Sequence, residues 1–115
     1  MNIAFLIVLL VVVPVGAFTI RAGRGEPSVA SARSAASLFT GNCASCHGRD
    51  GHAKTFKAKR NHARNLADPE WQGRVSDERI FNSIMNGKGK MPGYSKKFSE
   101  QEIDTLVTYV RGLRK

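Results

Sequence analysis

Acidic residues are scarce in this chain of 115 residues, which has nine Asp and Glu against 18 Lys and Arg. The N-terminal segment lacks charge of either sign, since every charged side chain lies after Ile20. The formal charge of +9 therefore belongs to the rest of the chain, and an excess of this size predicts acidic partners. The sequence also lacks a set of base-stacking aromatic residues and a helix-turn-helix pattern, so we expect no binding of nucleic acid.

Regular alternation and internal repeats are missing as well. No stretch alternates apolar and polar residues over more than about five positions, which argues against a β-sheet. Apolar residues recur instead at helical spacing, most clearly after a capping box at residues 99–102. The residues on that apolar face are Ile103, Leu106, Val107, Val110 and Leu113. These patterns predict an all-α domain.

Other segments give weaker signals of secondary structure. Helical spacing of apolar residues begins at Ala35 and continues up to the cysteines. Ser76 is suited to cap a second helix, which we expect to end at Gly87. Residues 48–65 are rich in Lys and have neither regular period, so we expect them to be mostly loop. Residues 68–70 are predicted to open a short helical turn.

The uncharged N-terminal segment is almost continuously apolar, interrupted by Pro14 and Gly16. Its length suits either a signal peptide or a membrane anchor, and we expect residues 1–20 to be one of the two. Small residues at positions 15–17 favour export followed by cleavage. The alternative, an apolar strand or core helix, is a poor match for so long an apolar run in a small domain.

The residues that follow the apolar segment predict a flexible linker over residues 21–34, which are rich in Gly, Ser, Ala and Arg. No Lys or Arg precedes the apolar segment, whereas Arg21 and Arg24 follow it, and the positive-inside rule alone would place the C-terminal part in the cytoplasm. The folded domain is expected over residues 35–115.

The sequence Cys43-Ala44-Ser45-Cys46-His47 matches C-x-x-C-H, the attachment pattern of c-type haem. Two thiols three positions apart on a helical turn can reach two vinyl groups of one porphyrin and form thioethers. The imidazole of His47, on the same turn, can then reach the iron. Because these are the only two cysteines and follow an export signal, we expect one covalently attached haem c with its iron.

Three other uses of the two cysteines fit the sequence less well. A disulfide between Cys43 and Cys46 would close a tight ring and leave His47 unexplained. A thioredoxin-like redox pair needs a preceding strand, which the pattern does not predict. Zinc would need both thiolates with two of His47, His52 and His62, and their spacing fits no common zinc module.

The sixth ligand of the iron distinguishes an electron carrier from a haem protein with an open site. Met91 is the preferred candidate, because it lies in a segment rich in glycine, directly before Pro92, whose fixed φ restricts the local path. Met85 falls on a predicted helix, where Met more often fills the core. His52 or His62 would give a bis-histidine haem of lower potential, although solvated loop positions are expected for both.

Together these residues resemble the class I c-type cytochromes, in particular the small monohaem carriers of bacteria and photosynthetic organisms. The resemblance covers residues 35–113 and is carried by Ala35, Phe39, residues 43–48, 77–86, 89–92 and 106–110. It implies the small cytochrome c fold, with three to five helices around one covalently bound haem. It also implies that the first and last helices cross near the haem, with Phe39 and Tyr109 in contact.

The resemblance assigns roles to particular residues. It implies that Cys43 and Cys46 carry the thioethers, that His47 is the proximal ligand and that Met91 is the distal ligand. For the haem propionates we predict contacts with Arg64 and Trp71, which are not fixed by any motif.

These assignments predict an electron carrier without substrate chemistry of its own, which transfers single electrons between redox complexes, for example in a respiratory chain. Lys88, Lys90 and the basic residues between positions 54 and 64 are expected to dock acidic redox proteins: an oxidase, a reductase or a reaction centre. We expect a periplasmic location, either soluble after cleavage or anchored to the inner membrane by residues 3–20. Alternatives are a dedicated electron-transfer subunit of a periplasmic oxidoreductase and a haem sensor or peroxidase-like protein with an open sixth site.

Overall fold

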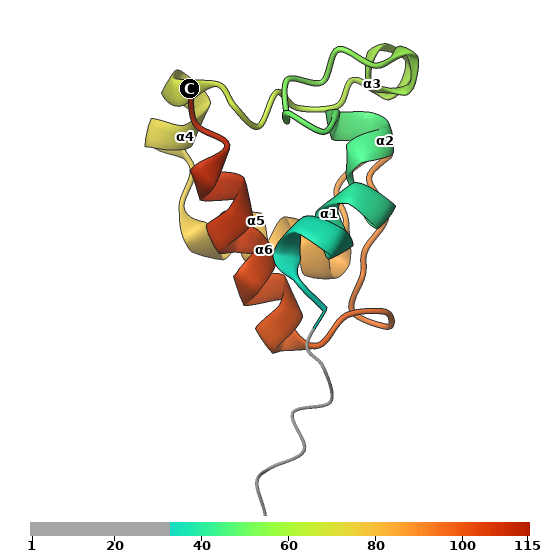
Figure 1. Ribbon diagram of the computed structural model, residues 1–115, viewed down its shortest axis with the longest axis vertical. Helices are drawn as coiled ribbons and strands as arrows, with labels where there is room; N and C mark the ends of the chain where they lie inside the picture. Colours follow the sequence, from blue (N-terminus) through green and yellow to red (C-terminus); the bar gives the residue numbers. More distant parts are fainter. Residues whose placement is uncertain (1–32) are drawn as a thin grey trace, which may run out of the picture.

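Six α-helices make up the part of the chain that the computed structural model describes, residues 33–115 (Figure 1). They are α1 (Ala35–Asn42), α2 (Ala44–His47), α3 (Phe56–Asn61), α4 (Pro69–Arg74), α5 (Asp77–Asn86) and α6 (Glu100–Gly112). Within these residues there is no strand, only an isolated antiparallel bridge between Lys88 and Met91. The all-α prediction is confirmed. The predicted signal peptide or anchor, and residues 21–32 of the predicted linker, lie outside the described residues.

The expected number of helices, three to five, was too low. Residues 48–65 are mostly loop, as expected, but they also contain the short helix α3, which the sequence analysis did not predict. The Thr55 side chain accepts a hydrogen bond from the Ala58 N–H at the start of α3, and His62 ends the helix with a left-handed φ of 54°. Ala58 is the only buried residue of α3. A helix without an apolar stripe has no periodicity for sequence analysis to detect.

Both predicted ends of α5 and the predicted start of α6 are confirmed. Ser76 caps α5 by accepting a hydrogen bond from the Arg79 N–H, and Gly87 ends that helix with a φ of 79°. At the start of α6, the Glu102 N–H donates to Ser99 Oγ at 3.2 Å. In return, the Ser99 N–H donates to Glu102 Oε2 at 3.0 Å, which completes the capping box.

The core forms where α6 packs against α1 on one side and α5 on the other. Leu38 and Phe39 of α1 are almost completely buried, as are Ile103 and Leu106 of α6. The rings of Phe39 and Tyr109 lie 5.0 Å apart at an angle of 40°, so the predicted aromatic contact between the first and last helices is confirmed. This crossing fixes the position of the segment that begins at Cys43.

A buried amide joins α4 to α6. The Gln72 side-chain amide donates to the Leu66 carbonyl at 2.8 Å and to the Val110 carbonyl at 2.7 Å. Arg111 of α6 donates to the Gln72 carbonyl at 2.7 Å and to the Val75 carbonyl at 2.6 Å. These bonds hold α4 and the start of α5 against the C-terminal half of α6.

None of the helices in residues 33–115 has the combined length and hydropathy of a membrane-spanning segment.

Candidate cofactor site

A cavity of about 640 Å³ lies between the helices, within the size range typical of cofactor sites. Its apolar wall includes Phe39, Leu66, Ile80, Ile84, Leu106 and Val110. All six site residues that the sequence predicted also line it, namely Cys43, Cys46, His47, Arg64, Trp71 and Met91. The fold therefore brings the cysteine motif and the methionine segment to the same space.

Cys43 lies at the junction of α1 and α2, and Cys46 lies within α2. The Cys43 N–H donates to the Phe39 carbonyl at 2.8 Å, so the turn that carries the motif continues directly from α1. Both residues are free thiols, not a disulfide. Burial raises the pKa of the Cys43 thiol to about 11, and the neighbouring Cys46 adds to the rise. At neutral pH Cys43 is therefore a thiol held in apolar surroundings at the cavity wall.

His47 is buried with a single hydrogen bond that orients its ring. Its Nδ1 lies 2.9 Å from the Arg64 carbonyl oxygen, which can only accept, so Nδ1 carries the proton. Nε2 makes no hydrogen bond to the described residues. Burial lowers the pKa of the imidazole, although the bond to the Arg64 carbonyl opposes this. A neutral, oriented imidazole with Nε2 free is the state in which histidine binds a metal.

Met91 lines the cavity from a tight turn. The N–H groups of Lys88 and Met91 each donate to the other residue's carbonyl at 3.0 Å. The turn packs closely on the end of α5. A Cβ added to Gly87 would lie only 2.6 Å from the Met91 carbonyl oxygen, too close for a side chain at this position. Met85, in contrast, packs against the core and is not among the residues that line the cavity.

The predicted propionate contacts differ in their surroundings. Trp71 is half-buried and packs against the core, whereas the Arg64 side chain is exposed. The Arg64 backbone carbonyl, and not its guanidinium, makes the hydrogen bond to His47. Sequence analysis missed Arg74 and Arg79, which line the same cavity from α4 and α5. No motif marks these two arginines, and only the packing of the helices brings them there.

Tyr94 is a further cavity residue that the sequence did not single out. Its hydroxyl donates to the Asn42 carbonyl at 2.9 Å, and its ring stacks on Phe98 with centroids 4.9 Å apart. Asn42 directly precedes Cys43, so this bond joins the methionine segment to the cysteine motif. Burial raises the pKa of the hydroxyl, which keeps it protonated and able to donate.

The two remaining histidines lie in different places. His62 lines the cavity at the end of α3, while His52 does not line it and lies 3.4 Å from a carboxylate oxygen of Asp50. Within residues 33–115 no three His, Cys, Asp or Glu side chains are grouped as they would be around a metal ion. The zinc alternative therefore has no geometric support in this part of the chain.

A flat apolar macrocycle fits this site, since two free thiols, a neutral imidazole and a thioether converge on one largely apolar cavity. An all-α domain with a C-x-x-C-H turn on the wall of such a cavity defines the class of c-type cytochromes. The chain belongs to the cytochrome c family, because residues 30–110 match the family described as "Cytochrome C oxidase, cbb3-type, subunit III".

Curated relatives include cytochromes c6. The chain is 37% identical over 75 residues to cytochrome c6 of Bryopsis maxima, covering 65% of this chain and 83% of that protein. With cytochrome c6 of Synechocystis sp. it shares 35% identity over 77 residues, which cover 64% of this chain and 58% of the relative. A more distant relative is the cbb3-type cytochrome c oxidase subunit FixP of Azorhizobium caulinodans, 30% identical over 79% of this chain and 30% of that protein.

Solved structures give the same result. The KustC0563 c-type cytochrome superposes with a TM-score of 0.67 at 36% identity, covering 71% of this chain and 99% of that structure. The family and these relatives establish a small cytochrome c fold with one covalently bound haem c and its iron, and the function of an electron carrier.

Proposed function

We propose that the chain is a His/Met-ligated one-electron carrier without substrate chemistry of its own, with Cys43 and Cys46 bound to the haem and His47 and Met91 as ligands of its iron. The observation that carries this proposal is the convergence of all four side chains on one cavity. When bound, the haem supplies a reversible ferric/ferrous couple. In each thioether, a cysteine sulfur bonds to one vinyl carbon while its hydrogen goes to the other carbon, so no oxidant is needed.

The surrounding residues hold the ligands in place and keep water out. The Arg64 carbonyl fixes the ring of His47 through Nδ1 and so directs Nε2 toward the cavity. Leu66, Ile80 and Leu106 supply an apolar wall. A thioether ligand in such surroundings raises the reduction potential relative to a second imidazole, which suits a carrier.

The carboxylates of the haem are expected to lie near the cationic part of the wall. We keep Arg64 and Trp71 as the proposed propionate contacts, through the guanidinium of Arg64 and the indole N–H of Trp71. Arg74 and Arg79 line the same cavity and provide two further positive charges for these carboxylates.

Acidic redox proteins are the proposed partners: an oxidase, a reductase or a reaction centre. Lys88 and Lys90 are exposed next to the methionine turn and line the cavity. The Lys90 ammonium donates to the Arg60 carbonyl at 3.1 Å, which brings this turn and α3 together at one positively charged border of the cavity. Attraction between such a border and carboxylates on a partner would speed association.

The proposed location is the bacterial periplasm, with residues 3–20 either removed after export or retained as an anchor. A permanently bound subunit of an oxidoreductase complex is the second candidate function, favoured by the match to the cbb3-type subunit III family. Co-purification of the chain with an oxidase from its native membrane would support the bound subunit over the free carrier.

The ligand assignment is tested by visible spectra of the chain, expressed in a host that attaches c-type haem. We expect a sharp low-spin reduced spectrum and the weak long-wavelength ferric band of methionine ligation. The band should disappear in Met91→Ala and persist in Met85→Ala, because only Met91 lines the cavity. A high-spin ferric spectrum of the unchanged protein would indicate an open sixth site and favour a sensor or peroxidase.

A further inference from the structure

Phe56 is an exposed aromatic side chain outside the hydrophobic core of the domain. It is the first residue of α3 and is 82% exposed, whereas the other large apolar side chains in residues 33–115 are buried or half-buried. An exposed Phe gives the folded domain none of the free energy that burial of such a side chain provides, about 2 kcal/mol. On a protein surface, an aromatic side chain of this kind is well suited to anchor a partner.

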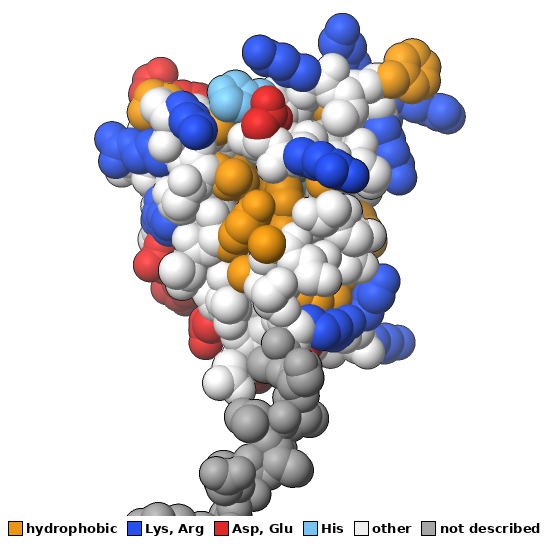
Figure 2. Space-filling model, viewed as in Figure 1, with side chains coloured by type: hydrophobic (Ala, Val, Ile, Leu, Met, Phe, Trp, Pro, Cys, Tyr) orange, Lys and Arg blue, Asp and Glu red, His pale blue; other side chains and the backbone are white. Residues whose placement is uncertain are grey.

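Positive charge surrounds this aromatic residue. Residues 49–64 contain six Lys and Arg and one acidic residue, Asp50. None of the six makes a salt bridge within the described part of the chain, whereas Asp50 pairs with His52. The surface over α3 in Figure 2 accordingly consists largely of Lys and Arg side chains around one projecting apolar group. The charges near Phe56 are therefore free to meet carboxylates of another molecule.

The position of α3 connects this surface to the cofactor. The Thr55 hydroxyl donates either to the Ser45 carbonyl at 3.0 Å or to the Cys46 carbonyl at 3.2 Å. The Asn61 amide lies 3.9 Å from the Cys46 sulfur. Helix α3 is thus held directly against the second cysteine of the motif, and a partner seated on α3 lies beside the haem.

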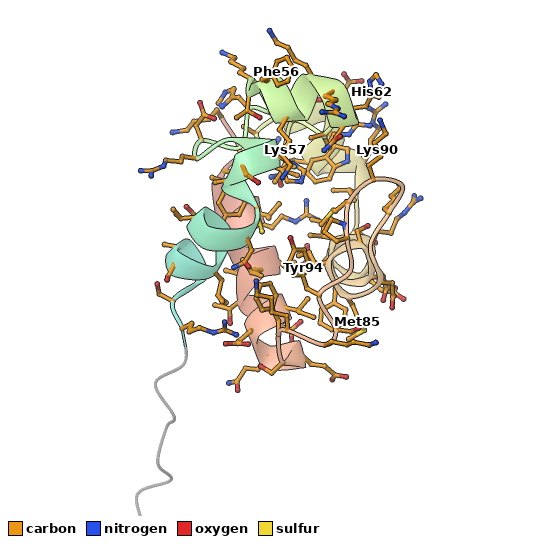
Figure 3. All side chains as sticks on the ribbon, turned by 90° about the vertical axis from the view of Figure 1, so that its right-hand side faces the viewer. Phe56, Lys57, His62, Met85, Lys90 and Tyr94 are labelled. Atoms are coloured by element: carbon orange, nitrogen blue, oxygen red, sulfur yellow. The ribbon has the colours of Figure 1, made fainter. Side chains whose placement is uncertain are left out.

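Resting on the proposed carrier function, we propose that Phe56 and its basic neighbours form a docking surface for a redox protein whose apolar pocket is ringed by carboxylates. Phe56 enters the pocket, and Lys57, Lys59 and Arg60 pair with the carboxylates. The other members of this surface are Lys54 and Lys90. Figure 3 shows Phe56, Lys57, His62 and Lys90 at one end of the domain, with Met85 toward the other end.

A protein pocket accounts for these features better than an anionic lipid surface does. Interfacial helices bury a whole apolar face in the bilayer, whereas α3 has six residues and exposes one large apolar side chain. In Figures 1 and 3, α3 lies at the opposite end of the domain from the first described residue, Arg33. The length of the domain therefore separates α3 from the point where the N-terminal residues join it.

The test measures the second-order rate at which the reduced, haem-loaded full chain transfers one electron to a purified cbb3-type cytochrome c oxidase. We expect Phe56→Ala to slow this transfer at least about tenfold at low ionic strength, and Phe56→Trp to restore it. Lys57→Glu should slow transfer much more than Lys96→Glu, which changes the net charge equally but lies in the turn before α6 (Figure 1). The reduction potential should not change in Phe56→Ala, because Phe56 does not line the cavity.

Three results would overturn the docking surface. One is equal transfer rates for the unchanged protein and for Phe56→Ala and Lys57→Glu. Another is a wild type that exchanges electrons with an electrode but not with the oxidase, which would leave the carrier function standing. The third is loss of binding to phosphatidylglycerol vesicles in Phe56→Ala with unchanged transfer to the oxidase, which would assign the surface to lipid. A chain without covalent haem would instead refute the proposed function itself.

Discussion

Tyr94 acts through a single hydroxyl group, which connects the methionine segment to the residue before Cys43. Tyr94→Phe keeps the ring stacked on Phe98 and removes only the bond to the Asn42 carbonyl. We expect a loss of about 1 kcal/mol in the free energy of unfolding of the haem-loaded protein, measured by urea denaturation. The control is Tyr109→Phe, because the Tyr109 hydroxyl makes no hydrogen bond to the described residues. Equal stability of both variants would show that the Tyr94 bond contributes nothing.

Single residues also show the limits of reading a site from sequence. Cys43, Cys46 and His47 could be predicted because one helical turn brings them together, and Met91 because of its glycine-rich surroundings. Arg74, Arg79 and Tyr94 reach the cavity only through packing of segments far apart in the chain. No local pattern distinguishes them from surface residues of the same type.

At the scale of elements, the methionine turn depends on close packing against the end of α5. A Cβ on Gly93 would lie 2.7 Å from the Asn86 carbonyl carbon and 2.8 Å from the Met85 carbonyl oxygen. Because backbone atoms there cannot move aside, Gly93→Ala is expected to shift the turn and weaken or abolish the long-wavelength ferric band. Gly73→Ala in α4 is the control, because its Cβ meets no atom within 4 Å. A Gly93→Ala variant with an unchanged band would refute this account of the turn.

The ion pair between Arg33 and Glu102 of α6 should make the stability of the protein depend on pH. The Arg33 guanidinium donates to both carboxylate oxygens of Glu102 at 3.0 Å, and these bonds, with those from Ser99, lower the Glu102 pKa. Because folding lowers this pKa, the ionised Glu102 carboxylate stabilises the folded protein at pH values above its ordinary pKa of 4.5. This stabilisation is lost as the pH falls through the lower pKa of the folded protein. In thermal unfolding between pH 7 and pH 3, Glu102→Gln should therefore lose less stability than the unchanged protein. Exposed Glu100→Gln should behave like the unchanged protein.

The helices differ in how well the sequence predicts them, for physical reasons. In α5 and α6 a capping side chain precedes residues that bury one apolar face, so the cap and the period agree. In α3 the cap at Thr55 is present, but the helix has no apolar face. It is held by hydrogen bonds to the cysteine turn, which only the folded chain reveals.

At the scale of the whole molecule, the positive charge predicts how salt changes the reaction of the reduced protein with small oxidants. The chain carries a formal +9, and exposed lysines adjoin the cavity. Electron transfer to hexacyanoferrate(III), an anion, should slow as ionic strength rises from about 0.01 M to 0.1 M, because the screening length falls from about 30 Å to about 10 Å. Transfer to tris(phenanthroline)cobalt(III), a cation, should become faster over the same range. Both rates are measured by stopped flow with the haem-loaded protein. The slope of the rate against ionic strength should be negative for the anion and positive for the cation. If transfer to the anion instead becomes faster with salt and transfer to the cation slower, the charge at the haem edge is not positive, and acidic partners would lose their electrostatic basis.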